Sequence, residues 1–178
     1  MEKGGATMRD ISTIPRISLA QLPTPLYRLP NISARTGKNV YIKRDDMTGV
    51  ALGGNKVRKL EFLLAHALEE GCDYVLTTGG AQSNHAMLTA ACCNRLGLHC
   101  ILVLKKRGVW EKKGNQLLDD LLGADVRFVD TDDYADVYAS NCSKTGISPT
   151  ACRWGAPWPW APWATPCASR NRWSRPKP

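Results

Sequence analysis

The sequence lacks any apolar run long enough to cross a lipid bilayer, and its N-terminus, MEKGGATMRDISTIPRIS, has no apolar core of the kind that a secretory signal peptide requires. These absences favour a cytoplasmic protein and predict no membrane partner. Histidine is also scarce, with three residues among 178, and none stands at metal-ligand spacing from a cysteine. We therefore expect no metal site.

Cysteine is present seven times, but no pair has the C-x-x-C spacing of a redox or metal motif. Four cysteines lie in apolar segments: Cys72, Cys92, Cys93 and Cys100. We interpret these four as small buried hydrophobic side chains in a reducing compartment. The other three are scattered along the C-terminal part of the chain: Cys142, Cys152 and Cys167.

Acidic residues are absent from Asn141 to the end, a segment that holds six of the 24 lysines and arginines. The net charge of +8 therefore belongs mostly to this segment, because the other 18 basic residues nearly balance the 16 acidic ones. We expect no nucleic-acid partner for the remainder. The segment also carries five of the six tryptophans and repeated prolines without helical or strand periodicity. We expect a folded part over 1–140 and an irregular tail over 141–178.

The folded part alternates helices and strands. Proline-rich residues 1–38 are expected to be irregular, and Asn39–Lys43 a short strand. Apolar periodicity predicts helices over Val57–Glu70, His85–Leu96 and Gly114–Leu122, and strands over Asp73–Thr78, His99–Lys105 and Asp125–Asp130. This order indicates an α/β fold with a parallel sheet, in which ligands bind outside the carboxyl ends of the strands.

The stretch LGGNKVRKLEF places Lys56 after two glycines, at the start of a predicted helix. A neutral lysine amine is a nucleophile, and glycines let the backbone approach a ligand closely. A Schiff base to an aldehyde cofactor fits this setting. Taken alone, the pattern favours a solvated surface lysine.

The stretch GGAQSNH follows the strand Asp73–Thr78, at the end of the strand where ligands bind. A glycine pair followed by small polar residues at a helix start can bind an anion or a ring. Capping of the helix would explain Ser83 and Asn84 equally well. Gln82 and His85 add donors and acceptors that a cap does not need. A third stretch, IKRDD, is expected to form structural ion pairs at the end of a strand.

Four motifs in this order, TPLYRLP, YIKRDD, GGNKVRKLEF and GGAQSNHAMLTAA, resemble the N-terminal part of the D-cysteine desulfhydrase and 1-aminocyclopropane-1-carboxylate deaminase family. The resemblance covers roughly Ile14 to Tyr138. It implies a three-layer, parallel-sheet fold of the tryptophan-synthase-beta type, incomplete in this chain. It also implies pyridoxal 5'-phosphate as cofactor, a small amino acid as substrate, and a homodimer for the complete enzyme.

The same resemblance implies roles for five residues. Lys56 would form the Schiff base with the cofactor, and Asn84 would hydrogen-bond its phenolic oxygen. Ser83 would bind the substrate carboxylate or relay a proton, with Gln82 nearby. His85 occupies a position where the desulfhydrase branch has His and the deaminase branch typically has Gln.

The resemblance implies a lyase that converts D-cysteine to pyruvate, sulfide and ammonia by β-elimination. The alternatives from the same family are a 1-aminocyclopropane-1-carboxylate deaminase and a cysteate sulfo-lyase. Two alternatives from other classes remain open. One is an inactive fragment, because the family's phosphate-binding loop and substrate tyrosines have no counterpart here. The other is a binding module that acts through the basic tail.

The tail itself suggests an out-of-frame reading. Tryptophan has one codon, so the four tryptophans from Trp154 to Trp163 force Gly, Ala, Gly and Gly when the tail is read two bases forward. The forced residues agree with a PVGGSxALGALGY-like segment of the family. We therefore expect a frameshift between about Tyr138 and Ile147, which resequencing of the gene would reveal.

Overall fold

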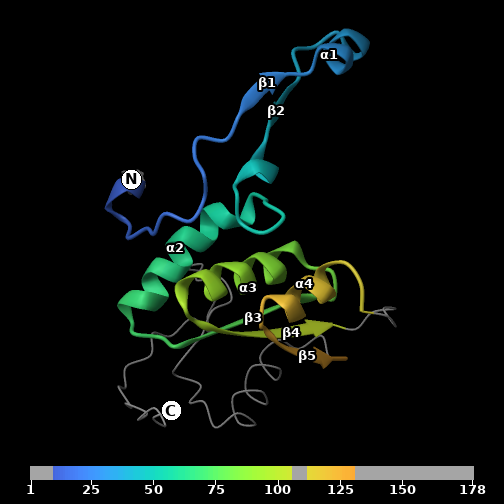
Figure 1. The fold of residues 1–178 in the computed structure, drawn as a ribbon. Helices are drawn as coiled ribbons and strands as arrows, with labels where there is room; N and C mark the ends of the chain where they lie inside the picture. The colour runs from blue at the N-terminus through green and yellow to red at the C-terminus, as the bar shows by residue number, and fades with distance from the viewer. Residues whose placement is uncertain (1–9, 106–111, 131–178) are drawn as a thin grey trace, which may run out of the picture.

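The computed structural model describes residues 10–105 and 112–130 (Figure 1). Its elements follow in the order η1 (Ile11–Thr13), β1 (Leu26–Arg28), α1 (Pro30–Thr36), β2 (Tyr41–Lys43), η2 (Asp45–Met47), α2 (Lys56–Glu69), β3 (Tyr74–Gly80), α3 (Asn84–Leu96), β4 (His99–Lys105), α4 (Asn115–Leu121) and β5 (Asp125–Val129). The predicted boundary at 140, the tail over 141–178 and the expected frameshift window lie outside the described residues. No helix in the described ranges is long and apolar enough to span a membrane.

Strands β3, β4 and β5 form a parallel sheet in that order, which confirms the predicted α/β class. The predicted helices and strands of this part agree with the structure to within one or two residues. Strand β3 continues past its predicted end, because Gly79 and Gly80 pair with Leu104 and Lys105 of β4. The GGAQSNH stretch therefore begins inside the sheet and leaves it at the carboxyl end of β3.

The prediction that residues 1–38 are irregular is wrong for two short elements. Strand β1 pairs antiparallel with β2, with Leu26 opposite Lys43, and helix α1 follows directly. Pro30 begins α1, where a missing N–H costs nothing and the fixed φ favours helix. The prolines of this region delimit these elements instead of preventing them. The β1–α1–β2 unit extends away from the sheet and its helices (Figure 1).

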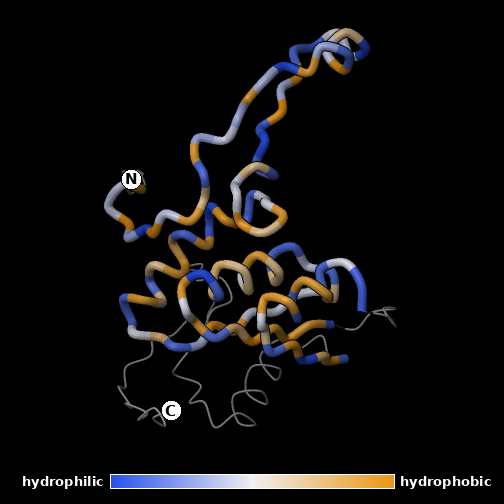
Figure 2. The backbone as a smooth tube through the Cα atoms, in the orientation of Figure 1, coloured by the Kyte–Doolittle hydropathy of each residue, from blue (hydrophilic) through white to orange (hydrophobic). Residues whose placement is uncertain are grey.

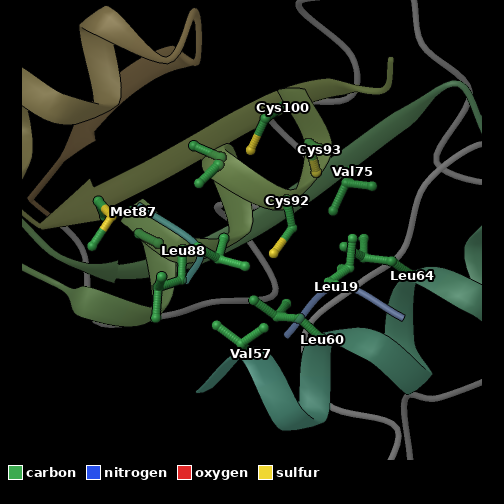
Figure 3. Close-up of a cluster of buried hydrophobic side chains, with 14 of the residues drawn as sticks. Leu19, Val57, Leu60, Leu64, Val75, Met87, Leu88, Cys92, Cys93 and Cys100 are labelled. Carbon is green, nitrogen blue, oxygen red and sulfur yellow. The ribbon is translucent and has the colours of Figure 1, made fainter. Parts of the chain in front are cut away.

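The hydrophobic core lies between the sheet and the helices α2 and α3 (Figure 3). Apolar residues concentrate along these helices and the central strands (Figure 2). Leu60 and Leu64 of α2 pack with Leu88 of α3 and with the strand residues Val75 and Leu102. A second cluster contains Leu76, Ile101 and Val103. These residues alternate along the strands with those of the first cluster, so they lie on the other face of the sheet. The sheet is therefore apolar on both faces, as parallel sheets are.

The four cysteines within residues 10–105 and 112–130 form no disulfide, and three of them are buried in the core. Cys92 and Cys93 come from α3 and Cys100 from β4 (Figure 3). Burial is the main reason that the pKa of Cys92 is raised to about 12. These three side chains therefore serve as packing groups, as predicted, whereas Cys72 is only half-buried.

A buried carboxylate fastens the N-terminal segment to α2. Oε1 of Glu61 accepts hydrogen bonds from the backbone N–H groups of Leu19 (2.9 Å) and Ala20 (2.8 Å). Its Oε2 accepts one from Nε of Arg16 at 2.7 Å. Burial alone would raise the pKa of Glu61, but the hydrogen bonds from Ala20, Leu19 and Arg16 outweigh it and lower the pKa. The segment therefore covers the apolar side of α2 with its polar groups satisfied.

Candidate active site

The loop before α2 is folded back tightly, and this sets where Lys56 begins the helix. Gly53 has φ +73°, and a Cβ on it would lie 1.8 Å from the backbone oxygen of Asp46. The next N–H, of Gly54, donates to the backbone oxygen of Asp45 at 2.8 Å. A Cβ on Gly54 would lie 3.1 Å from Leu88 of α3. The two glycines thus bring the start of α2 close to the neighbouring helix.

The IKRDD stretch anchors this loop through ion pairs, as predicted. Asp45 accepts hydrogen bonds from Arg58 (2.7 Å) and Thr24 (2.7 Å). The hydrogen bond from Arg58, followed by that from Thr24, lowers the pKa of Asp45 to about 2. Arg44 pairs with Asp46 at 2.6 Å on the surface. Asp45 therefore ties the turn before Lys56 to the first turn of α2.

Ser83 caps helix α3 at the exit from β3. Its Oγ accepts a hydrogen bond from the N–H of Ala86 at 3.2 Å. A Cβ on Gly79 would lie 2.8 Å from both Cβ and Oγ of Ser83. Glycine is thus required at position 79 for the Ser83 side chain to sit against the strand end. The sequence could not separate capping from ligand binding, and the structure shows the cap.

Three basic side chains gather where α2 and α3 begin. Nζ of Lys59 lies 3.4 Å from Nε2 of His85, and Oγ1 of Thr77 lies 3.5 Å from the same nitrogen. Burial, followed by the charges of Lys59 and Lys56, lowers the pKa of His85 to about 4. Burial and the charge of Lys56 also lower the pKa of Lys59. His85 is therefore neutral near pH 7, beside two lysine side chains.

One polar atom of this cluster has no partner. Nδ1 of His85 is buried and has no hydrogen-bond partner among the described residues. A lysine ammonium group can only donate, so Lys59 favours the tautomer in which Nε2 accepts and Nδ1 carries the proton. A buried donor without a partner costs free energy. A ligand with an acceptor atom would satisfy it.

Gln82 and Asn84 contact the start of α4 instead of the basic cluster. Nε2 of Gln82 donates to the backbone oxygen of Lys113 (2.8 Å), and its Oε1 accepts from the N–H of Asn115 (3.0 Å). Oδ1 of Asn84 accepts from Nδ2 of Asn115 at 2.7 Å. Both ends of the Gln82 amide are thus engaged, and its contact with substrate stays a prediction. Sequence reasoning missed Asn115, although a Gly-Asn pair at a predicted helix start was its signal.

The structure thus places the five predicted residues at the N-terminal ends of α2 and α3. Lys56 and His85 belong to the basic cluster, together with Lys59, which the sequence motifs did not single out. Ser83, Gln82 and Asn84 follow each other at the exit from β3, and Asn115 of α4 joins the last two. No group of His, Cys, Asp and Glu that could hold a metal ion is found within residues 10–105 and 112–130.

Comparison with known proteins agrees with the family resemblance of the sequence motifs. A family model described as "Pyridoxal-phosphate dependent enzyme" matches residues 17–151. A putative 1-aminocyclopropane-1-carboxylate deaminase of Pyrococcus horikoshii is 46% identical over 145 residues, covering 78% of this chain and 44% of that protein. A D-cysteine desulfhydrase of Klebsiella pneumoniae is 42% identical over 152 residues, covering 80% and 46%.

A solved structure of an ACC deaminase homologue superposes with a TM-score of 0.68 at 46% identity, covering 76% of this chain and 43% of the other. The chain spans less than half the length of each of these relatives. The matched region contains every described residue of the candidate site. The chain belongs to the family of pyridoxal-phosphate-dependent enzymes, among the homologues of 1-aminocyclopropane-1-carboxylate deaminase and D-cysteine desulfhydrase.

Proposed function

We propose that this chain provides the N-terminal part of a pyridoxal-phosphate-dependent lyase that releases sulfide from D-cysteine. The observation that carries the proposal is the basic cluster, in which Lys56 and Lys59 lie near a half-buried, neutral His85 at the carboxyl end of β3. The complete enzyme would act in the cytoplasm as a homodimer on a small amino acid.

The residues of the cluster fit the cofactor. Pyridoxal phosphate is an anionic aldehyde, which requires a primary amine and positive surroundings. Lys56 is a half-buried amine, Lys59 adds a second cation, and the orphaned Nδ1 of His85 is a donor that lacks an acceptor. Lys56 would hold the cofactor covalently, and Asn84 would donate to its ring oxygen. When bound, the cofactor withdraws electrons from the substrate's α-carbon and makes its proton acidic.

The neighbouring side chains would then bind the substrate and move protons. The Oγ of Ser83 already accepts from Ala86, so its hydroxyl proton remains available for a substrate carboxylate. His85 is neutral near pH 7, so it can accept a hydrogen bond at Nε2 and donate one from Nδ1. In the overall reaction a proton leaves Cα and the Cβ–S bond breaks, with its electron pair leaving on sulfur as sulfide. The remaining enamine takes up water and yields pyruvate and ammonia.

A second candidate is deamination of 1-aminocyclopropane-1-carboxylate. Relatives named for this activity are 41–51% identical to the chain, whereas the D-cysteine desulfhydrases are 42–44% identical. His85 favours desulfhydration, because its imidazole stands where the deaminase branch typically has Gln. A cysteate sulfo-lyase is a third member of the same class. Sulfide production from D-cysteine distinguishes the first candidate, since the cyclopropane substrate contains no sulfur.

Covalent labelling tests the proposal directly. The full chain is mixed with pyridoxal phosphate, reduced with borohydride, digested and analysed by mass spectrometry. We expect the added mass on the peptide that contains Lys56, and its loss in Lys56→Ala. Lys38→Ala, which removes an exposed lysine of the β1–α1–β2 unit, serves as the matched control and should keep the label.

Equal labelling of exposed lysines in all three proteins would refute a specific site. A labelled chain that releases neither sulfide from D-cysteine nor ammonia from the cyclopropane substrate would instead support the inactive-fragment interpretation. Nucleic-acid binding that weakens with salt and disappears on deletion of 141–178 would support the tail as a binding module.

A further inference from the structure

The orientation of the Gln82 amide is fixed by backbone groups that have only one hydrogen-bonding role. The N–H of Asn115 can only donate, and it lies 3.0 Å from Oε1 of Gln82. The backbone oxygen of Lys113 can only accept, and it lies 2.8 Å from Nε2 of the same side chain. Both contacts demand the same orientation of the Gln82 amide. The loop before α3 is therefore held firmly to the start of α4.

The orientation of the Asn115 amide is fixed in the same way. Its Nδ2 lies 3.0 Å from the backbone oxygen of Gln82, an acceptor only. The same Nδ2 lies 2.7 Å from Oδ1 of Asn84. Because Asn115 presents a donor, Asn84 must present its carbonyl oxygen to it. The NH₂ end of Asn84 is then directed away from Asn115, and it makes no hydrogen bond within the described ranges.

Burial and backbone geometry show that this contact is built into the fold. Asn115 is 9% exposed, whereas Asn84 is an exposed residue. Gly114 has φ +60°, and a Cβ on it would lie 2.5 Å from Oε1 of Gln82. A side chain at position 114 would therefore push the Gln82 amide out of place. The Gly-Asn pair at the start of α4 therefore packs against the loop that carries Ser83 and Asn84 and forms hydrogen bonds with it.

We propose that Asn115 is a positioning residue for the cofactor site, which holds the Asn84 amide so that its NH₂ group is the end offered to an anionic oxygen on the cofactor ring. The inference rests on the proposed function, because it assumes that Asn84 faces pyridoxal phosphate. Without Asn115, the Asn84 amide would be free to turn and present its carbonyl oxygen to that anion.

Two isosteric substitutions test the proposal in the full chain. Asn115→Asp keeps the backbone N–H to Gln82 but replaces the donor that faces Asn84 with an acceptor. Asn94→Asp is the matched control, because Nδ2 of Asn94 also links α3 to the α4 region, through the backbone oxygen of Leu122 at 3.2 Å. Both variants carry the same charge change, but only the first reaches Asn84.

The readouts are the dissociation constant for pyridoxal phosphate and the absorption band of the bound cofactor, which reports the ionisation of its ring oxygen. We expect Asn115→Asp to weaken binding by about tenfold or more and to shift the band, since a charge-assisted hydrogen bond is lost. Asn94→Asp should leave the band unchanged and the dissociation constant within about twofold. In an Asn84→Ala background, Asn115→Asp should cause little further loss of cofactor affinity, because Asn115 acts through Asn84.

Equal effects of the two Asn→Asp variants, or a full additional loss in the Asn84→Ala background, would overturn the positioning role alone. Failure of the unmodified chain to bind pyridoxal phosphate would overturn the proposed function, and this inference with it.

A measurement on the unmodified chain avoids the risk that a variant misfolds. The side-chain NH₂ of Asn115 should exchange slowly with solvent and that of Asn84 rapidly, and cofactor should shift the Asn84 signal. Rapid exchange at Asn115 would contradict the proposal.

Discussion

Nζ of Lys59 lies 3.4 Å from Nε2 of His85, although 26 residues separate them in the sequence. The contact joins the first turns of α2 and α3 and lies beside Lys56, which the proposed function makes the cofactor lysine. Two cations thus lie near a half-buried imidazole. This arrangement keeps His85 neutral over the physiological range of pH.

The ionisation of His85 provides a direct check. We expect NMR titration of its ring protons to give a pKa near 4. Lys59→Met should raise this pKa, because a neighbouring positive charge is removed, but leave it below the ordinary value of 6.5, because burial is the larger cause. Lys112→Met, a change at a lysine paired with Asp120, should leave the titration of His85 unaltered. A pKa of His85 near 6.5 in the unmodified chain would contradict this account.

The same group makes stability depend on pH. The folded-state pKa of His85 is lowered, so the unfolded chain takes up a proton at a higher pH than the folded one. Stability is therefore fully present above pH 6.5 and declines as pH falls toward about 4. Allowing for partial exposure, we expect a loss of about 1–2 kcal/mol from this residue. Denaturant unfolding of wild type and His85→Gln at pH 7 and pH 4 measures the difference, and identical pH profiles would argue against it.

Replacement of the buried Glu61 carboxylate should release the N-terminal segment. Glu61→Gln places an NH₂ group toward donors from Leu19, Ala20 or Arg16, so at least one of them loses its acceptor. We expect the free energy of unfolding to fall by about 2–3 kcal/mol. Glu69→Gln on the exposed end of the same helix is the control and should change it by less than about 0.5 kcal/mol. Comparable losses in both variants would show that the contact is not specific.

The close turn before Lys56 should tolerate no side chain at position 53. Gly53→Ala combines a left-handed φ of +73° with a Cβ placed 1.8 Å from the backbone oxygen of Asp46. We expect a loss of more than ~2 kcal/mol in stability, together with weaker labelling of Lys56 by the cofactor. Gly97→Ala has a similar φ of +71° but no atom within 4 Å, so it should lose only about 1 kcal/mol. If calorimetry gave the two variants the same melting temperature, steric closure of the loop would be excluded.

Predictions from the sequence succeeded where the signal is local and repeated. The apolar period of α2 and the unbroken apolar run of β4 each follow from neighbouring residues, and the structure has both. The prediction failed for β1 and α1, because a strand of three residues is stabilised by its partner β2 and not by its own composition. Lys56 and His85 were singled out through motif order. Lys59 was not, since nothing in its own segment marks it, and the Gly-Asn pair at the start of α4 was not recognised as a signal for Asn115.

The sequence by itself determined the alternation of helices and strands, the buried character of three cysteines, and the family to which the chain belongs. It also determined that a polar stretch follows β3, at the end of the strand where parallel sheets bind ligands. Only the tertiary structure decided which residues meet there. Segments 26 to 31 residues apart converge because α2, α3 and α4 pack together through side chains, and packing partners are not encoded in any single segment. That convergence places Lys59 against His85 and directs the Asn84 amide through Asn115.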